Sequence, residues 1–246
     1  GLLDAVRTNF NFQNRNLRLY EIGKAFSASS EERGLPNERE LFALVVTGSE
    51  TFEKKAFAMR EFDFYDAKGA LESAISSTNA PTLSFKAADI KHLRKGQSAE
   101  VLLNGKTVGT IGRLSDEIAD NYKFRQPVFV AEVDLQTVLN AKEQSVFYRP
   151  LPVYPSIERD VSLLVNRNIS FAEIKQAIES EGFEILRKIE FVDVFEGKGV
   201  ADDERSLTIR LVYRSDVRTL IESEIETINN KILKNLEENF GTKQRF

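Results

Sequence analysis

Seven residues in the second half of the chain have types and a spacing that suit recognition of an unpaired nucleic-acid base. They are Asp160, Ser162, Asp193, Phe195, Ser206, Thr208 and Arg210. They alternate with apolar residues in three short segments, and successive side chains of a β-strand point to opposite faces. The sequence therefore predicts one apolar face and one face carrying this set. An aromatic ring stacks on bases, and short polar groups hydrogen-bond to base edges. The alternative is that this face packs against a neighbouring domain.

Side-chain chemistry predicts what each kind of residue in this set would do. The Phe195 ring would stack on a base, and the short polar side chains would hydrogen-bond to base edges. Arg210 or Arg205 would contact phosphate. Asp160 and Ser162 complete the predicted binding set.

Other candidate chemistry is weak. No phosphate-binding GxxxxGK[ST] is present, and no GxGxxG follows a predicted strand. Gly109 and Gly112 lie on one arm of a predicted hairpin, which favours a turn or a close-packing role. His92, the only histidine, lies in a polar segment without a recognisable serine partner. The acidic run 202–204 is typical of a solvated loop. We therefore predict no catalytic residue and no metal site in this chain.

Composition fits a folded, soluble protein, with 41% hydrophobic and 29% charged residues. The chain has no cysteine, which suits a reducing cytoplasm and excludes disulfides and thiolate metal sites. No apolar run approaches the roughly 20 residues of a membrane helix, and the first residues lack signal-peptide features. Basic and acidic residues balance over 1–149, so the net charge of −4 falls on 150–246. Neither half is therefore a basic nucleic-acid-binding module by bulk charge, and any contact with RNA must use a local surface. The absence of an initial methionine suggests a piece of a longer protein.

After residue 155, the sequence pattern clearly indicates the strands and helices that must position these side chains. Strands are predicted over 161–165, 185–195, 206–213 and 241–246, with helices over 170–181 and 219–238. Ser170 and Glu173 form a capping-box signal, and Gly182 follows the first helix. The long helix places Ile221, Ile225, Ile228, Ile232, Leu233 and Leu236 on one face. The order strand, helix, strand, strand, helix, strand predicts a ferredoxin-like βαββαβ domain.

For the residues before 150, the sequence pattern predicts a mixed α+β structure with hairpin-connected strands. Helices are expected over 2–10 and 64–77 and after Ser115, and strands over 17–26, 41–47 and 128–133. A hairpin is expected at Asn104-Gly105, because both turn positions need positive φ. Three of the six prolines lie within 150–155 and stiffen that segment. We therefore predict two domains, 1–147 and 148–246.

Several strings closely resemble those of the bacterial phenylalanyl-tRNA synthetase beta-subunit family. In the second half they are residues 154–165 (YPSIERDVSLLV), 191–200 (FVDVFEGKGV), 205–211 (RSLTIRL) and 218–220 (RTL). In the first half they are residues 14–26 (NRNLRLYEIGKAF), 64–72 (FYDAKGALE), 96–99 (GQSA) and 108–114 (VGTIGRL). The resemblance covers essentially the whole chain. It implies a catalytic-like class II module without catalytic motifs over 1–147, in which Arg18 and Glu21 echo the strand of the second class II motif. An anticodon-binding domain follows over 148–246.

The resemblance also implies partners and site residues. The family enzyme is an alpha2beta2 heterotetramer in which the alpha subunit activates phenylalanine with ATP and magnesium, so no cofactor is expected in this chain. tRNA(Phe) and the alpha subunit are the implied partners, with no membrane and no DNA. The family's anticodon-reading positions correspond to Ser162, Asp193, Phe195 and Ser206. Many members have tyrosine where this chain has Phe195, so the ring is kept and a phenolic hydroxyl is absent. The family's editing domain would lie upstream of residue 1.

The sequence thus predicts the part of a phenylalanine-tRNA ligase beta subunit that binds the tRNA(Phe) anticodon and supports assembly, while aminoacylation occurs in the alpha subunit. Two alternatives stay open. One is a subunit-assembly scaffold that binds no RNA. The other is a regulatory βαββαβ module that binds an amino acid, although such modules generally carry a glycine-rich turn after the first strand and this chain has Asn166-Arg-Asn-Ile there.

Overall fold

The computed structural model describes residues 1–28, 35–50, 60–141, 148 and 151–245. The chain divides into two compact units, Gly1–Phe147 and Tyr148–Phe246, and each is described by itself. Arg149 and Pro150 of the predicted proline-rich connector lie outside the described residues. Within the described part of the chain, no helix has both the length and the apolar character needed to cross a membrane.

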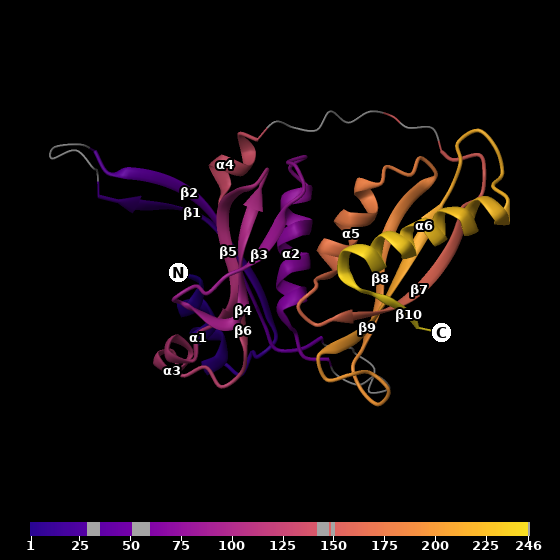
Figure 1. The fold of residues 1–246 in the computed structure, drawn as a ribbon. Coiled ribbons are helices and arrows are strands. Elements are labelled where there is room, and N and C mark those ends of the chain that lie inside the picture. The colour runs from indigo at the N-terminus through magenta and orange to yellow at the C-terminus, as the bar shows by residue number, and fades with distance from the viewer. Residues whose placement is uncertain (29–34, 51–59, 142–147, 149–150, 246) are drawn as a thin grey trace. The chain divides into compact units, whose positions relative to one another are not determined.

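The first unit is built on a six-stranded antiparallel sheet with the strand order β1-β2-β6-β5-β4-β3 (Figure 1). Its elements are α1 (Leu2–Asn11), β1 (Leu17–Ser27), β2 (Asn37–Thr47), α2 (Phe64–Ser76), β3 (Ser84–Ala87), β4 (Leu93–Leu103), β5 (Lys106–Leu114), α3 (Asp116–Asn121), β6 (Val128–Asp134) and α4 (Leu135–Leu139). The predicted α+β class is confirmed. The sequence analysis missed β3 and α4, because segments of four and five residues are too short to show a periodic pattern.

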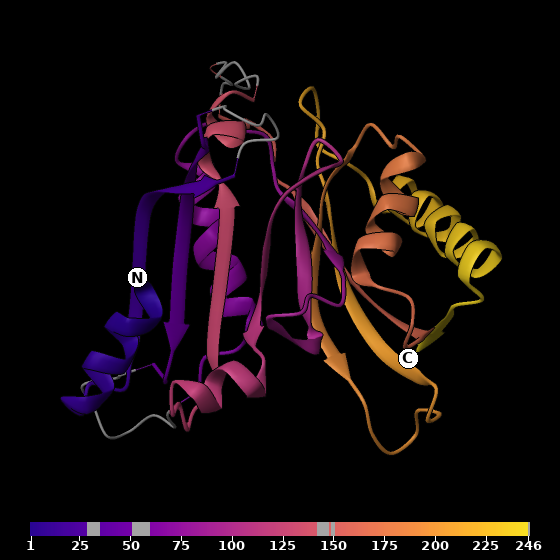
Figure 2. The same cartoon turned by 90° about the vertical axis from the view of Figure 1, so that its left-hand side faces the viewer.

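Helices cover both faces of this sheet. The buried residues of α2 pack with Phe42, Leu44 and Val46 of β2 on one face (Figures 1 and 2). Val45 of the same strand points the other way and packs with Val6 and Phe10 of α1. The alternation along β2 therefore supplies two apolar cores from one strand, which is the pattern of a strand buried on both faces.

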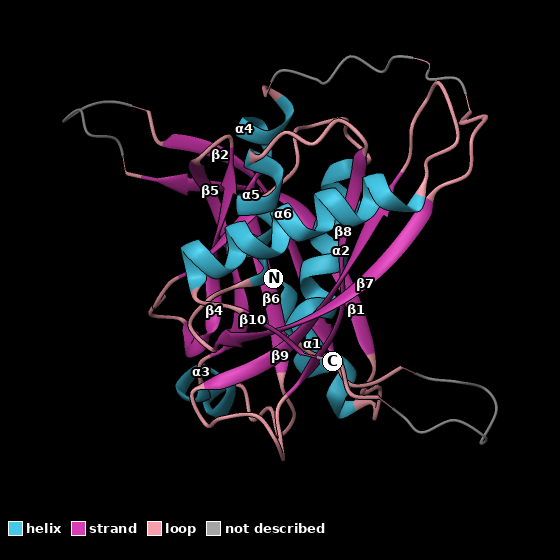
Figure 3. Ribbon diagram, turned by 45° about the vertical axis from the view of Figure 1, so that its right-hand side comes forward, coloured by secondary structure: helices cyan, strands magenta, loops and turns pink. Residues whose placement is uncertain are grey.

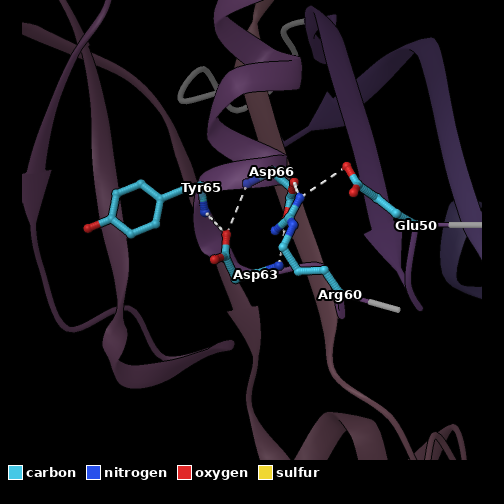
Figure 4. Close-up of polar contacts among 5 residues, drawn as sticks. All are labelled: Glu50, Arg60, Asp63, Tyr65 and Asp66. Atoms are coloured by element: carbon cyan, nitrogen blue, oxygen red, sulfur yellow. Dashed lines mark hydrogen bonds and ion pairs between the residues drawn. The ribbon is translucent and has the colours of Figure 1, made fainter. Parts of the chain in front are cut away.

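Polar groups fix the start of α2 (Figure 4). The Asp63 carboxylate accepts hydrogen bonds from the backbone N–H groups of Tyr65 (2.7 Å) and Asp66 (3.2 Å), and Asp66 accepts in return from the Asp63 N–H (2.7 Å). Arg60 holds Asp66 through two hydrogen bonds and also contacts Glu50 at 3.2 Å. The bond with Arg60 lowers the pKa of Asp66. These contacts satisfy the free N–H groups of the helix terminus, so they have a structural explanation.

The glycines of β5 have a packing role. A Cβ atom on Gly109 would lie 2.1 Å from the Glu132 carbonyl oxygen, and one on Gly112 would lie 2.6 Å from the Gln97 carbonyl oxygen. The neighbouring strands therefore approach closer than any other residue allows. The close-packing interpretation of this glycine pair is confirmed. The Asn104-Gly105 turn before β5 has the predicted positive φ angles of 51° and 76°.

The second unit is a four-stranded antiparallel sheet with the order β10-β7-β9-β8 and two helices. Its elements are β7 (Ile157–Asn166), α5 (Phe171–Ser180), β8 (Leu186–Phe195), β9 (Glu204–Tyr213), α6 (Glu222–Phe240) and β10 (Lys243–Arg245). Figure 2 shows both helices on one side of this sheet, and Figure 3 shows α6 lying across the strands. The predicted βαββαβ order and ferredoxin-like fold are confirmed.

The long helix begins later than predicted, at Glu222 instead of residue 219. Ile221 has extended backbone angles, and its N–H donates to the Glu224 carboxylate at 3.2 Å, which Arg218 also binds. Hydrogen bonds from Arg218 and the Ile221 N–H lower the pKa of Glu224 to about 2. Ile221 is 60% exposed, so its predicted place on the buried face was wrong. Ile225, Ile232 and Leu236 are buried as predicted.

We expect Tyr213→Phe to leave the unfolding free energy of the second unit unchanged or raise it by about 1 kcal/mol at neutral pH. The Tyr213 side chain is fully buried, and its hydroxyl has no hydrogen-bond partner among the described residues. Removing an unpaired buried hydroxyl removes a desolvation cost. Urea unfolding measures this difference, and a clear loss of stability would show that the hydroxyl is paired.

The same substitution changes the alkaline limit of stability. Burial raises the pKa of Tyr213 to about 12, above its ordinary value of 10. The unfolded chain therefore releases this proton at a lower pH than the folded chain does, so the folded state keeps its stability below pH 10 and loses stability as the pH rises toward 12. Urea unfolding between pH 9 and 11.5 should show a steeper loss in the wild type than in Tyr213→Phe.

Candidate nucleic-acid interface

Strand register places all seven predicted residues on the face of the second sheet that the helices leave open. In antiparallel strands, residues directly opposite each other point to the same side. The pairs are Asp160 with Arg210, Ser162 with Thr208, Thr208 with Asp193, and Ser206 with Phe195. The intervening residues Leu163, Leu207 and Ile209 are buried in the core with α5 and α6. Tertiary pairing thus brings together side chains up to 50 residues apart.

Strand β8 departs from simple alternation. Phe191 pairs with Ile209 and Asp193 pairs with Thr208, so Val192 is an extra residue in a bulge. Strict alternation would turn Val192 toward the helices, but a bulge residue leaves the ladder and is not held there. Val192 is 41% exposed. Phe191, two residues before Asp193, instead pairs with a core residue and contacts the Phe171 ring edge-on at 5.9 Å.

One end of the open face carries a network of charges. The Arg210 guanidinium donates to both carboxylate oxygens of Asp160 at 2.7 and 2.8 Å and lies 3.3 Å from Glu158. The hydrogen bonds with Arg210 lower the pKa of Asp160, and those with Asp160 raise the pKa of Arg210. Two neighbouring carboxylates therefore already engage the guanidinium that was expected to contact phosphate.

Arg205, the other residue expected to contact phosphate, does not lie on the open face of the sheet. Arg205 pairs with the buried Val165 and donates to the Ile169 carbonyl oxygen at 2.7 Å, next to the start of α5. Its position therefore belongs to the helix-covered side of the sheet. Arg205 was predicted as the alternative phosphate contact, and the register of β9 gives it the orientation of Leu207, away from the open face.

The middle of the open face holds the hydroxyl groups. Ser162 Oγ and Thr208 Oγ1 are 2.9 Å apart and share a hydrogen bond. Asp193, in the same row, is exposed. Ser206 faces the same side but is only 4% exposed, between Leu164 and Phe195 in its row. The structure therefore presents the Asp193 carboxylate directly, whereas the Ser206 hydroxyl becomes accessible only when neighbouring side chains move.

The aromatic residue of the face has a cationic neighbour. Phe195 is 43% exposed, and the Arg245 guanidinium carbon lies 4.9 Å from the centre of its ring. Arg245 comes from β10 and pairs with Ser162, so it belongs to the open face. Lys243 pairs with Leu164 and shares that face. The sequence analysis predicted a last strand here but missed both residues, because alternation within three residues does not show which face they occupy.

The remaining candidates form no second site. The described residues contain no group of three or more His, Asp or Glu side chains arranged to hold a metal ion. His92 immediately precedes β4, and its carbonyl oxygen accepts a hydrogen bond from the Ser115 N–H at 3.1 Å. In the first unit, Arg18 of β1 lies over the Phe62 ring at 4.5 Å, and Glu21 is exposed on the same strand.

Comparison with known protein families divides the chain in two. Residues 1–135 match the model of the phenylalanyl-tRNA synthetase beta chain CLM domain. Residues 152–245 match the model of the ferredoxin-fold anticodon-binding domain. The second match contains the open face.

Curated relatives match along the whole length. The phenylalanine–tRNA ligase beta subunit of Carboxydothermus hydrogenoformans is 34% identical over 100% of this chain, and that of Geobacillus kaustophilus is 33% identical over 98%. The chain spans about 30% of the length of each relative. A solved pyrrolysyl-tRNA synthetase from Desulfitobacterium hafniense has 13% identity and a TM-score of 0.41, over 56% of this chain and 46% of that one.

Proposed function

Because the chain belongs to the phenylalanyl-tRNA synthetase beta chain family, we propose that residues 148–246 bind the anticodon of tRNA(Phe). The observation that carries this proposal is the open face of the second sheet, where a half-exposed ring, an exposed carboxylate and hydroxyl groups lie together. An unpaired anticodon base offers what such a face recognises, a flat surface for stacking and a hydrogen-bonding edge.

Phe195 provides the stacking surface and Asp193 the hydrogen-bond acceptor for a base edge. Ser162 of β7 and Ser206 of β9 supply hydroxyl groups from the two central strands, and Asp160 and Arg210 form an ion pair in the row next to Ser162. A carboxylate accepts hydrogen bonds from base amino and imino groups only. A base that presents an acceptor there leaves Asp193 unpaired when the contact is desolvated, and this penalty is the source of discrimination.

The first unit acts as scaffold and subunit interface in this proposal. Residues 1–147 correspond to part of the catalytic-like module of the beta chain, and the alpha subunit carries out the ATP- and magnesium-dependent aminoacylation. Arg18, which resembles a residue of the second class II motif, packs its guanidinium on the Phe62 ring. The alternative to anticodon binding is that the whole chain serves only alpha2beta2 assembly and contacts no RNA.

An NMR titration of the whole chain with the tRNA(Phe) anticodon stem-loop tests the proposal. We expect amide shifts clustered at Asp193, Phe195 and Ser206, and smaller shifts with a stem-loop whose anticodon bases are exchanged. The amides of the first sheet serve as the internal reference. Shifts that are absent, or identical for both RNAs, would refute anticodon recognition and favour the assembly role.

A further inference from the structure

The contact between Phe195 and Arg245 joins opposite edges of the open face. β8 and β10 are the two outer strands, with β9 and β7 between them. Neighbouring strands lie about 4.8 Å apart, so a contact between the outer strands requires both side chains to reach inward over the central strands. The guanidinium and the ring therefore meet above β7 and β9, at 4.9 Å. Ser206, which lies in the same row as Phe195, is buried.

Arg245 differs from Arg210 and Lys188, two other cations of this face, in its partners. Arg210 is held by Asp160 and Glu158, and Lys188 at the far end contacts Glu190. Arg245 has no carboxylate partner among the described residues, and its contact is the ring itself. A guanidinium without a carboxylate partner keeps its full charge and hydrogen-bonding capacity for a phosphate group.

We propose that Arg245 occupies the stacking position on Phe195 in the free protein and moves to an RNA phosphate when a base takes that position. This inference rests on the proposed function and adds a contact residue to the same site. Both steps of this exchange, the replacement of Arg245 by a base on the ring and the move of Arg245 to a phosphate, favour the bound state. An exposed cation–π contact is weaker than the stacking of a base on a ring, and the released guanidinium gains a charge-assisted hydrogen bond.

The movement also clears the ring for RNA. When Arg245 leaves Phe195, the face of the ring that it covered becomes available to a base. Arg245 therefore serves both as a cover of the free site and as an anchor of the bound RNA. Because the cover is a side chain in the last strand, opening it requires no change in the sheet.

The test compares Arg245→Gln and Arg245→Lys with the wild-type chain, using the anticodon stem-loop and a series of salt concentrations. One phosphate contact on single-stranded RNA contributes about 0.7 to the slope of log affinity against log salt. We expect Arg245→Gln to lower this slope by about 0.7 and to weaken binding about fourfold at 0.15 M salt, the factor that this slope gives. Arg245→Lys keeps the charge and should keep the slope.

Lys234→Gln is the matched control, because it removes one positive charge from an exposed position of α6 on the helix-covered side. It should leave the slope unchanged. If Phe195→Ala weakens binding while Arg245→Gln binds like the wild type or more tightly, the role of Arg245 is refuted and anticodon binding stands. If both variants fold like the wild type and neither changes RNA affinity, anticodon recognition at this face is refuted as well.

Discussion

Phe195→Ala should weaken binding of the tRNA(Phe) anticodon stem-loop by about 1–3 kcal/mol, or roughly 5- to 150-fold. This side chain is the aromatic ring that strand register and exposure place on the open face beside Asp193. Its removal takes away the stacking surface, and it also frees Arg245, which cannot replace the ring. Isothermal calorimetry or fluorescence anisotropy with the whole chain measures the change.

Phe191→Ala is the control for this variant. Phe191 is on the same strand and is 50% exposed, but it pairs with a core residue and contacts Phe171. Its truncation should reduce stability with little effect on RNA affinity. Phe195→Tyr keeps the ring and should bind within a few-fold of the wild type. Equal affinities for Phe195→Ala and the wild type would rule out stacking on this ring.

Gly109→Ala should destabilise the first unit by about 3 kcal/mol or more. The added Cβ would lie 2.1 Å from the Glu132 carbonyl oxygen and 2.7 Å from the Val133 Cα, and both are backbone atoms. A flexible side chain could rotate away, but a paired strand can yield only by moving apart from β5. Urea unfolding followed by amide resonances of β5 and β6 measures the loss.

Gly69→Ala makes the same chemical change as Gly109→Ala, but we expect it to raise the stability of the first unit. Gly69 lies inside α2, and a Cβ there would meet no atom within 4 Å. Alanine is the better helix former by about 1 kcal/mol, so this variant should gain stability. If both variants had equal stability, the close approach of β5 and β6 would not constrain residue 109.

The sequence predicted most of the second unit correctly because each of its elements carries its own local signals. Ser170 and Glu173 form the predicted capping box, and Gly182 has the positive φ that ends a helix. The start of α6 was misplaced because the bond between Arg218 and Glu224 holds residues 219–221 outside the helix. The periodic pattern of apolar residues, from which the helix was predicted, carries no information about that side-chain contact.

Local pattern, then, determined the α+β class, the βαββαβ order and the face on which Asp193, Phe195 and Ser206 lie, because alternation and capping depend on neighbours in the chain. Tertiary structure alone decided which of these groups are available. The pairing of Arg210 with Asp160, the bulge at Val192 and the reach of Arg245 to Phe195 depend on strand register. Register joins residues far apart in sequence, and its energy comes from the packed sheet as a whole, so no local pattern records it.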